Sequence, residues 1–218
     1  MMITKMAEDL AAVRQATADM GAATVSLTAR AIRALQEDDE ELAQTAADDY
    51  PRLAQMNTEI EVKAIRILLL YQPAAEDARM ISTVLESISH MERIGKNAKS
   101  IAEIVLLLDD QIMIEPFPAI ERMGNTAETM IRIAVDGFTR NSVEGFDRLR
   151  ELDSILDVGR RDSYRDATEH IKQCPDSVDV YTQYLFVTRY LERMGDHACD
   201  MAEKVAFMVT GRHIEIDG

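Results

Sequence analysis

The sequence predicts an all-α protein built from two tandem, structurally similar three-helix bundles. Five prolines, nine glycines and no tryptophan in 218 residues favour helices over strands, as does the abundance of Ala, Leu, Met, Glu and Arg. A stretch near the middle, HMERIGKNAKSIAE at 90–103, has a related copy near the end, YLERMGDHACDMAE at 190–203. Between 91–103 and 191–203, 6 of 13 positions are identical, which indicates an internal duplication.

Both copies of this motif lie in segments with a helical spacing of apolar residues. The first copy follows this spacing from Met80 to Leu108. Around the second copy the apolar positions alternate in steps of four and three, and they are Val180, Tyr184, Val187, Leu191, Met194, Ala198, Met201, Val205 and Met208. Each copy is therefore expected on a long helix with a narrow apolar seam.

The first half supplies two further helices before its motif helix. Apolar residues from Met6 to Leu35 predict one long helix, and those of Leu42–Tyr71 predict a second, with Pro51 as a candidate kink. Gln72–Pro73 then breaks the chain before the motif helix of about Ala75–Leu108. Three long antiparallel helices joined by short turns form a three-helix bundle.

The predicted boundary between the halves is Asp109–Pro118, which contains two prolines and has no helical period. The first bundle is placed at residues 1–110 and the second at residues 115–212.

The second half repeats the pattern of the first. A fourth helix is predicted over Ile120–Phe138, and a fifth from Glu144 to about Lys172. A turn at 174–177 precedes the sixth helix, and Asp176 or Ser177 is its candidate cap.

Charge and composition disfavour several classes of function. A formal net charge of −15 disfavours binding to a nucleic-acid backbone, which draws on clustered Lys and Arg. No apolar run approaches the roughly 20 residues that span a bilayer, and the N-terminus has no signal-peptide pattern. Two cysteines without ligand-like spacing form no disulfide framework, so we expect a soluble protein of the reducing cytosol.

Several segments resemble the PhoU family of phosphate-uptake regulators. They are ERIGKNAKSIAE and ERMGDHACDMAE on the two motif helices, LLLYQP at the end of the second helix, and VTGRHIEI near the C-terminus. The resemblance covers nearly the whole chain, and its duplicated placement makes it more specific than a single ERxGD string. It implies a fold of two three-helix bundles in tandem.

The resemblance also implies a role without catalysis, so no catalytic or cofactor-binding residue is assigned. PhoU-like proteins are cytoplasmic adaptors that relay phosphate sufficiency between a phosphate transporter and a sensor kinase. We therefore expect a phosphate ABC transporter and a sensor histidine kinase as partners, and a homodimer as the assembly. Some members carry metal clusters on outward carboxylates spaced as Glu/Asp-x-x-x-Asp.

Five carboxylates of the second bundle are the predicted metal ligands. Glu192, Asp196 and Asp200 stand four residues apart, which places neighbours about 6 Å from one another on a helix face turned away from the seam. An antiparallel turn before the sixth helix puts Asp157 level with Glu192 and Asp153 level with Asp196. Carboxylates gathered in this way need a cation to offset their repulsion, and iron, zinc, nickel and magnesium are the candidates.

The first bundle departs from this pattern, because Lys96 and Ser100 stand where the second bundle has acids. Lys96 is expected to pair with Glu92 or Glu103 and so to take the place of a metal in this half.

Two further features of the motif have open interpretations. His197 lies beside Asp196, so it either joins the metal site or is an ordinary surface histidine. Gly95 and Gly195 each cost about 1 kcal/mol inside a helix, so their recurrence indicates close approach of another backbone or of a partner.

Three classes of function remain open. The first is the adaptor. The second is a ferritin-like di-metal enzyme, which requires Glu-x-x-His, and none of the four histidines has Glu three residues before it. The third is a metal-free helical module that binds another partner, because an outward acidic face is ordinarily a solvated surface.

Overall fold

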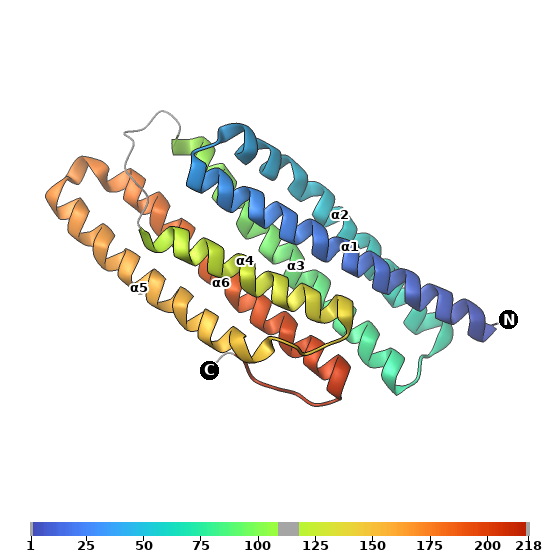
Figure 1. Cartoon of the computed structure of the whole chain (residues 1–218). Coiled ribbons are helices and arrows are strands. Elements are labelled where there is room, and N and C mark those ends of the chain that lie inside the picture. The colour runs from blue at the N-terminus through green and yellow to red at the C-terminus, as the bar shows by residue number, and fades with distance from the viewer. Residues whose placement is uncertain (1, 109–117, 217–218) are drawn as a thin grey trace.

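The structure is all-α, as the sequence predicts (Figure 1). The computed structural model describes residues 2–108 and 118–216. A short 3-10 turn precedes each of the last two helices, η1 (Phe146–Arg148) and η2 (Pro175–Ser177). The long helices of the described residues are α1 (Met2–Glu37), α2 (Glu40–Tyr71), α3 (Ala75–Leu108), α4 (Pro118–Arg140), α5 (Leu149–Gln173) and α6 (Val178–Thr210).

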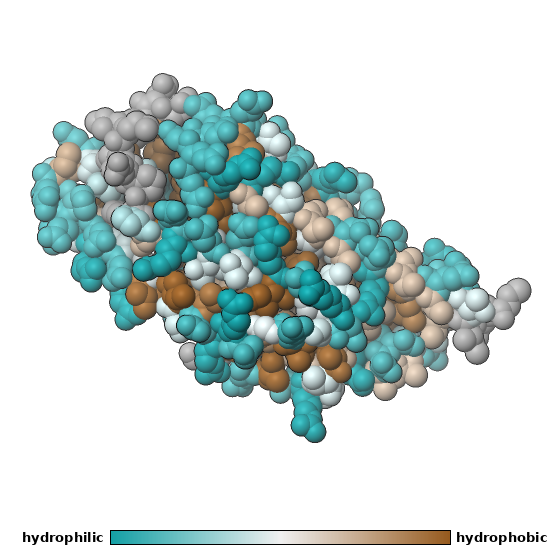
Figure 2. Space-filling view, viewed as in Figure 1, coloured by the Kyte–Doolittle hydropathy of each residue, from teal (hydrophilic) through white to brown (hydrophobic). Residues whose placement is uncertain are grey.

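The helices form two bundles that lie against each other. Helices α1, α2 and α3 pack together in the first bundle, and α4, α5 and α6 pack together in the second. The bundles meet where α3 contacts α6 and α1 contacts α4, which leaves α2 and α5 on opposite outer sides (Figure 1). Hydrophilic residues cover much of the face in Figure 2. None of the described helices is long and apolar enough to cross a membrane.

The positions of the first four helices agree with the sequence prediction. Helix α2 continues through Pro51 and spans the predicted segment, and α3 has the predicted bounds. Of the predicted boundary between the halves, residues 109–117 lie outside the described part of the chain. Its last residue, Pro118, is the first residue of α4, where proline's fixed backbone angle suits a helix start.

The predicted start of the fifth helix at Glu144 is wrong, because α5 begins at Leu149. Gly145 has a positive φ of 85°, a left-handed conformation that a helix interior does not contain. The buried Phe146 ring then packs over Gly137, where a Cβ atom would lie 2.5 Å from Phe146 Cζ. This contact holds residues 146–148 in a 3-10 turn before the helix begins.

The predicted cap of the sixth helix is only partly correct. Ser177 is the N-cap residue of α6, but its hydroxyl makes no capping bond to the helix. It donates instead to the carbonyl of Cys174 at 2.6 Å and so closes the turn between α5 and α6.

Two glycines determine how closely the bundles approach along α1 and α4. A Cβ atom at Gly21 would lie 2.7 Å from Val135 Cγ1, and one at Gly124 would lie 2.8 Å from Ile32 Cγ2. Gly124 and Val135 each stand 103 residues after their counterparts in the first half. The same contact is therefore made twice, and the bundles are related by an approximate twofold axis.

Candidate functional site

Helices α3 and α6 carry the two motif copies and lie antiparallel where the bundles meet. Near one end of this contact, the Thr83 hydroxyl donates to the Lys204 carbonyl at 3.1 Å, and the Lys204 ammonium lies 2.9 Å from a Glu86 carboxylate oxygen. Further along, His90 lies beside Asp200. The fold thus brings the two motifs, which are far apart in the sequence, onto a shared contact.

The recurrent glycines of the motif make room for a leucine of the same bundle. A Cβ atom at Gly95 would lie 2.2 Å from Leu53 Cδ2, and one at Gly195 would lie 2.3 Å from Leu156 Cδ1. The predicted close approach is confirmed, but the approaching group is a side chain of the preceding helix. It is neither another backbone nor a partner protein.

Glu192 is paired with an arginine that the sequence analysis did not select. Its side chain is 16% exposed, and a carboxylate oxygen forms an ion pair with Arg160 on α5, 2.8 Å from Nε. Burial raises the pKa of Glu192 despite the lowering effect of Arg160, and the nearby charge of Asp157 adds to the rise. The influence of Asp157 agrees with the register predicted for α5 and α6.

The other predicted ligands of the second bundle lie in different surroundings. Asp153 and Asp196 are partly buried and Asp157 is exposed. The Asp200 side chain is 51% exposed and lies beside two histidines, so it is directed to the contact between the bundles. Metal binding by Glu192, Asp196, Asp200, Asp153 and Asp157 together stays a prediction.

The motif acids of the first bundle pair with side chains of the same bundle. Glu92 accepts a hydrogen bond from the Tyr50 hydroxyl, and Glu103 pairs with Lys99 at 3.1 Å. The prediction that Lys96 pairs with Glu92 or Glu103 is wrong, because each acid has another partner among the described residues. Burial, followed by the bond to Glu92, raises the pKa of Tyr50 to about 12, so the phenol stays protonated.

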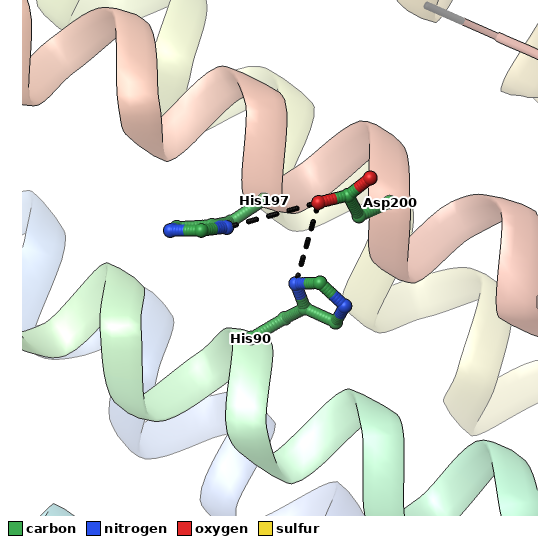
Figure 3. A group of neighbouring side chains, drawn as sticks. All are labelled: His90, His197 and Asp200. Carbon is green, nitrogen blue, oxygen red and sulfur yellow. Dashed lines mark ion pairs between the residues drawn. The ribbon is translucent and has the colours of Figure 1, made fainter.

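Three potential metal ligands converge between α3 and α6 (Figure 3). They are His90 from the first bundle and His197 and Asp200 from the second. Their ligand atoms all lie within 4.8 Å of one another, and within the described residues no other such group of His, Cys, Asp or Glu is found. His197 is only 8% exposed, so the interpretation as a surface histidine is wrong.

Both histidines of this group are neutral at pH 7. Burial lowers the pKa of His90 and lowers that of His197 to about 4, because a charged imidazolium loses its hydration there. The two rings lie 5.5 Å apart between centroids, so each would also repel a charge on the other. Neutral imidazole carries a lone pair on one ring nitrogen, which is the form that binds metals.

A family model described as the PhoU domain matches residues 17–105 and again residues 120–205, so each match contains one motif copy. The chain belongs to the PhoU family. A relative from Caulobacter vibrioides, named phosphate-specific transport system accessory protein PhoU homolog, is 31% identical over 211 residues, which are 95% of this chain and 90% of the relative. A relative of the same name from Clostridium acetobutylicum is 27% identical over 187 residues, 85% of each chain.

Solved PhoU structures have the same architecture. The crystal structure of PhoU from Pseudomonas aeruginosa superposes with a TM-score of 0.89 at 27% identity, covering 94% of this chain and 99% of that one. PhoU from Streptococcus pneumoniae gives a TM-score of 0.82 at 24% identity, covering 96% and 99%, and this likeness concerns the fold alone. The resemblance inferred from the motifs is therefore confirmed, together with the tandem-bundle fold.

Two residues of the candidate site were missed by sequence reasoning, and only one had a local signal. Arg160 follows Asp157 by three residues, so the two share a face of α5. Glu192 pairs with Arg160, and the charge of Asp157 acts on it. His90 is the first residue of the first motif copy, but its neighbours in the site come from the other bundle. Only the register between α3 and α6 places it beside His197.

The glycine–leucine contact predicts a specific loss of stability. We expect Gly195→Ala to lower the free energy of unfolding by about 1 kcal/mol, because overpacking costs about 1–3 kcal/mol and alanine's helix propensity recovers about 1 kcal/mol. Leu156→Ala removes the group that the new methyl meets. The double variant should therefore lose less free energy of unfolding than the sum of the losses in the two single variants. Urea unfolding of the four proteins measures this coupling.

The matched cycle for this test is Gly95→Ala with Leu53→Ala in the first bundle, which contains the same contact. Coupling of the same sign is expected there. Strictly additive costs in both cycles would show that the leucines do not limit the motif glycines.

Proposed function

We propose that this protein is a non-catalytic accessory protein of a phosphate-specific transport system, which acts in the cytoplasm and restrains phosphate uptake and starvation signalling when phosphate is plentiful. The observation that carries this proposal is the PhoU domain matched twice, once over each bundle. Relatives that align with most of the chain are named as accessory proteins of phosphate-specific transport.

We further propose that it acts as an adaptor between the transporter and a sensor kinase. An adaptor needs two contact surfaces on one body. The pairing of the bundles leaves α2 and α5 on opposite outer sides, so each offers a separate surface (Figure 1). The identity of the transporter and kinase, and the homodimer, stay predictions.

The two outer surfaces differ in their chemistry. Helix α2 exposes apolar side chains near its C-terminal end, among them Val62, Ile65, Leu69 and Leu70. Exposed apolar groups that gather on one element are typical of protein contacts. Between α5 and α6 lies a groove of about 710 Å³ lined by Arg160, Arg161 and Arg189. Different chemistry on the two sides supports two different partners.

The groove between α5 and α6 supports contact with an acidic segment of a partner. Tyr164 and Phe186 line it as exposed rings beside the three guanidinium groups. Arginine binds carboxylates through paired N–H donors, and exposed aromatic rings often anchor interfaces. In a chain of net charge −15, a local gathering of arginines gives an acidic segment a complementary surface.

Deletion of the gene tests the proposed role. In a host with its phosphate transporter intact, we expect starvation genes to stay expressed, or phosphate uptake to stay unrestrained, in high phosphate. Transcript levels and phosphate uptake rates measure this, and complementation by the intact gene is the control. Expression and uptake equal to the parent strain would favour a helical module with another role.

Charge reversal in the groove tests the adaptor contact. We expect Arg161→Glu to weaken co-purification of the transporter or the kinase, because repulsion replaces attraction toward an acidic partner segment. The matched control is Arg33→Glu, which makes the same charge change on the exposed side of α1, outside both proposed contact surfaces. Co-purification should also weaken with added salt.

Equal effects of the two charge reversals would contradict a contact in the groove, because they would reflect net charge alone. Circular dichroism of both variants should match the parent, since both side chains are exposed.

A further inference from the structure

The spacing between His90, His197 and Asp200 fits a shared metal ion better than hydrogen bonds. The Nδ1 atoms of His90 and His197 lie 3.6 and 3.8 Å from the same carboxylate oxygen of Asp200 (Figure 3). Both nitrogens are buried and have no hydrogen-bond partner in the described structure. Ligands at about 2.0–2.1 Å from a tetrahedral ion are separated by about 3.4 Å, so a small inward movement brings all three into coordination.

We propose that His90, His197 and Asp200 bind one divalent ion of the Zn²⁺ class between the two bundles. Two imidazole nitrogens and one carboxylate oxygen form a donor set that suits borderline ions such as Zn²⁺, Co²⁺ and Fe²⁺ more than Mg²⁺ or Ca²⁺. Three protein ligands leave one coordination position for water or another small ligand.

The surroundings of the two histidines favour the ligating state. His197 is more than nine-tenths buried and its Nδ1 points to Asp200, so ordering the ring costs little on metal binding (Figure 3). The lowered pKa of both histidines means that neither ring must lose a proton at pH 7.

Charged groups around the site have opposing effects on the binding of a cation. Arg93, Arg193 and Lys204 disfavour a cation, while Asp200 and Glu86 favour it. Lys204 is already paired with Glu86, and Arg93 and Arg193 are exposed, so solvent screens their repulsion. Direct coordination by three ligands outweighs these screened charges.

This site differs from the carboxylate face predicted from the sequence, with which it shares only Asp200. Its ligands come from both bundles, so an ion bound there joins α3 to α6 across their contact. Metal binding should therefore stabilise the pairing of the bundles as well as the folded chain. The proposal does not depend on the role in phosphate transport.

Zn²⁺ and Co²⁺ binding to the whole chain tests the proposal. The protein is prepared without a histidine tag, stripped of metal and titrated with Zn²⁺ by calorimetry, and Co²⁺ absorption reports the coordination geometry. The decisive variant is His90→Gln. The matched controls are His170→Gln, an exposed histidine of α5, and Asp157→Asn, which removes a ligand of the predicted carboxylate face.

We expect one ion per parent chain and a visible Co²⁺ spectrum of tetrahedral type. His90→Gln should weaken Zn²⁺ binding by at least about tenfold, the smallest loss common even for groups that only support a ligand. Both controls should bind as the parent does. Zn²⁺ should raise the melting temperature of the parent and of both controls, but not that of His90→Gln.

Three results would overturn the proposal. They are no binding by the parent, parental affinity in His90→Gln, and a loss in Asp157→Asn as large as that in His90→Gln, which would assign the ion to the carboxylate face. His197→Gln should behave as His90→Gln does if it folds. If this buried variant does not fold, His90→Gln decides the question alone.

Discussion

The close contact between α3 and α6 determines where the other helices lie. Each motif helix has two neighbouring helices in its own bundle and a third neighbour in the other bundle. A helix with three neighbours is buried over most of its surface, so small residues are needed where a neighbour approaches most closely. The motif supplies them, because Ala98, Ala102, Ala198 and Ala202 are fully buried. Positions that are identical in the two copies therefore include many of the packing positions.

The duplicated packing tolerates a change in helix length. Gly95 follows its contact residue Leu53 by 42 residues, whereas Gly195 follows Leu156 by 39. The missing three residues are close to one helical turn. The side chains that remain therefore point in nearly the same directions, although the connection between the two helices is shorter. This explains why the motif helices repeat at 100 residues, while the glycines of α1 and α4 repeat at 103. The contact is retained and the connection around it has changed.

Much of the fold could be predicted from the sequence, because helical spacing and duplication are local signals. Apolar residues at steps of three and four place α3 and α6 without any tertiary information. The start of α5 was harder to predict. Phe146 continues the helical spacing of apolar residues, although the left-handed conformation of Gly145 interrupts the helix. The side chain that contacts each motif glycine could not be predicted either, since a recurring glycine indicates close approach but does not identify the group that approaches.

The candidate sites could be predicted only as far as one helix or one hairpin defines them. The prediction that Asp157 lies level with Glu192 follows from a short turn between antiparallel helices. The effect of the Asp157 charge on Glu192 agrees with it. The convergence of His90 and His197 depends on the register in which the two bundles lie against each other. No local pattern specifies that register. It results from the sum of many buried contacts along α3, α6, α1 and α4.

The approximate twofold axis explains why the histidine cluster occurs only once among the described residues. An axis that exchanges α3 and α6 sends His90 to the position of Tyr190 and His197 to that of Asn97. A contact across such an axis occurs twice, and the second occurrence here offers a phenol and an amide in place of two imidazoles. The Asn97 amide nitrogen is buried without a hydrogen-bond partner in the described structure, so this end of the contact also has an unsatisfied polar group. Gly21 and Gly124 repeat the same close contact between the bundles, whereas the polar residues that differ between the halves make one end of the α3–α6 contact chemically distinct from the other.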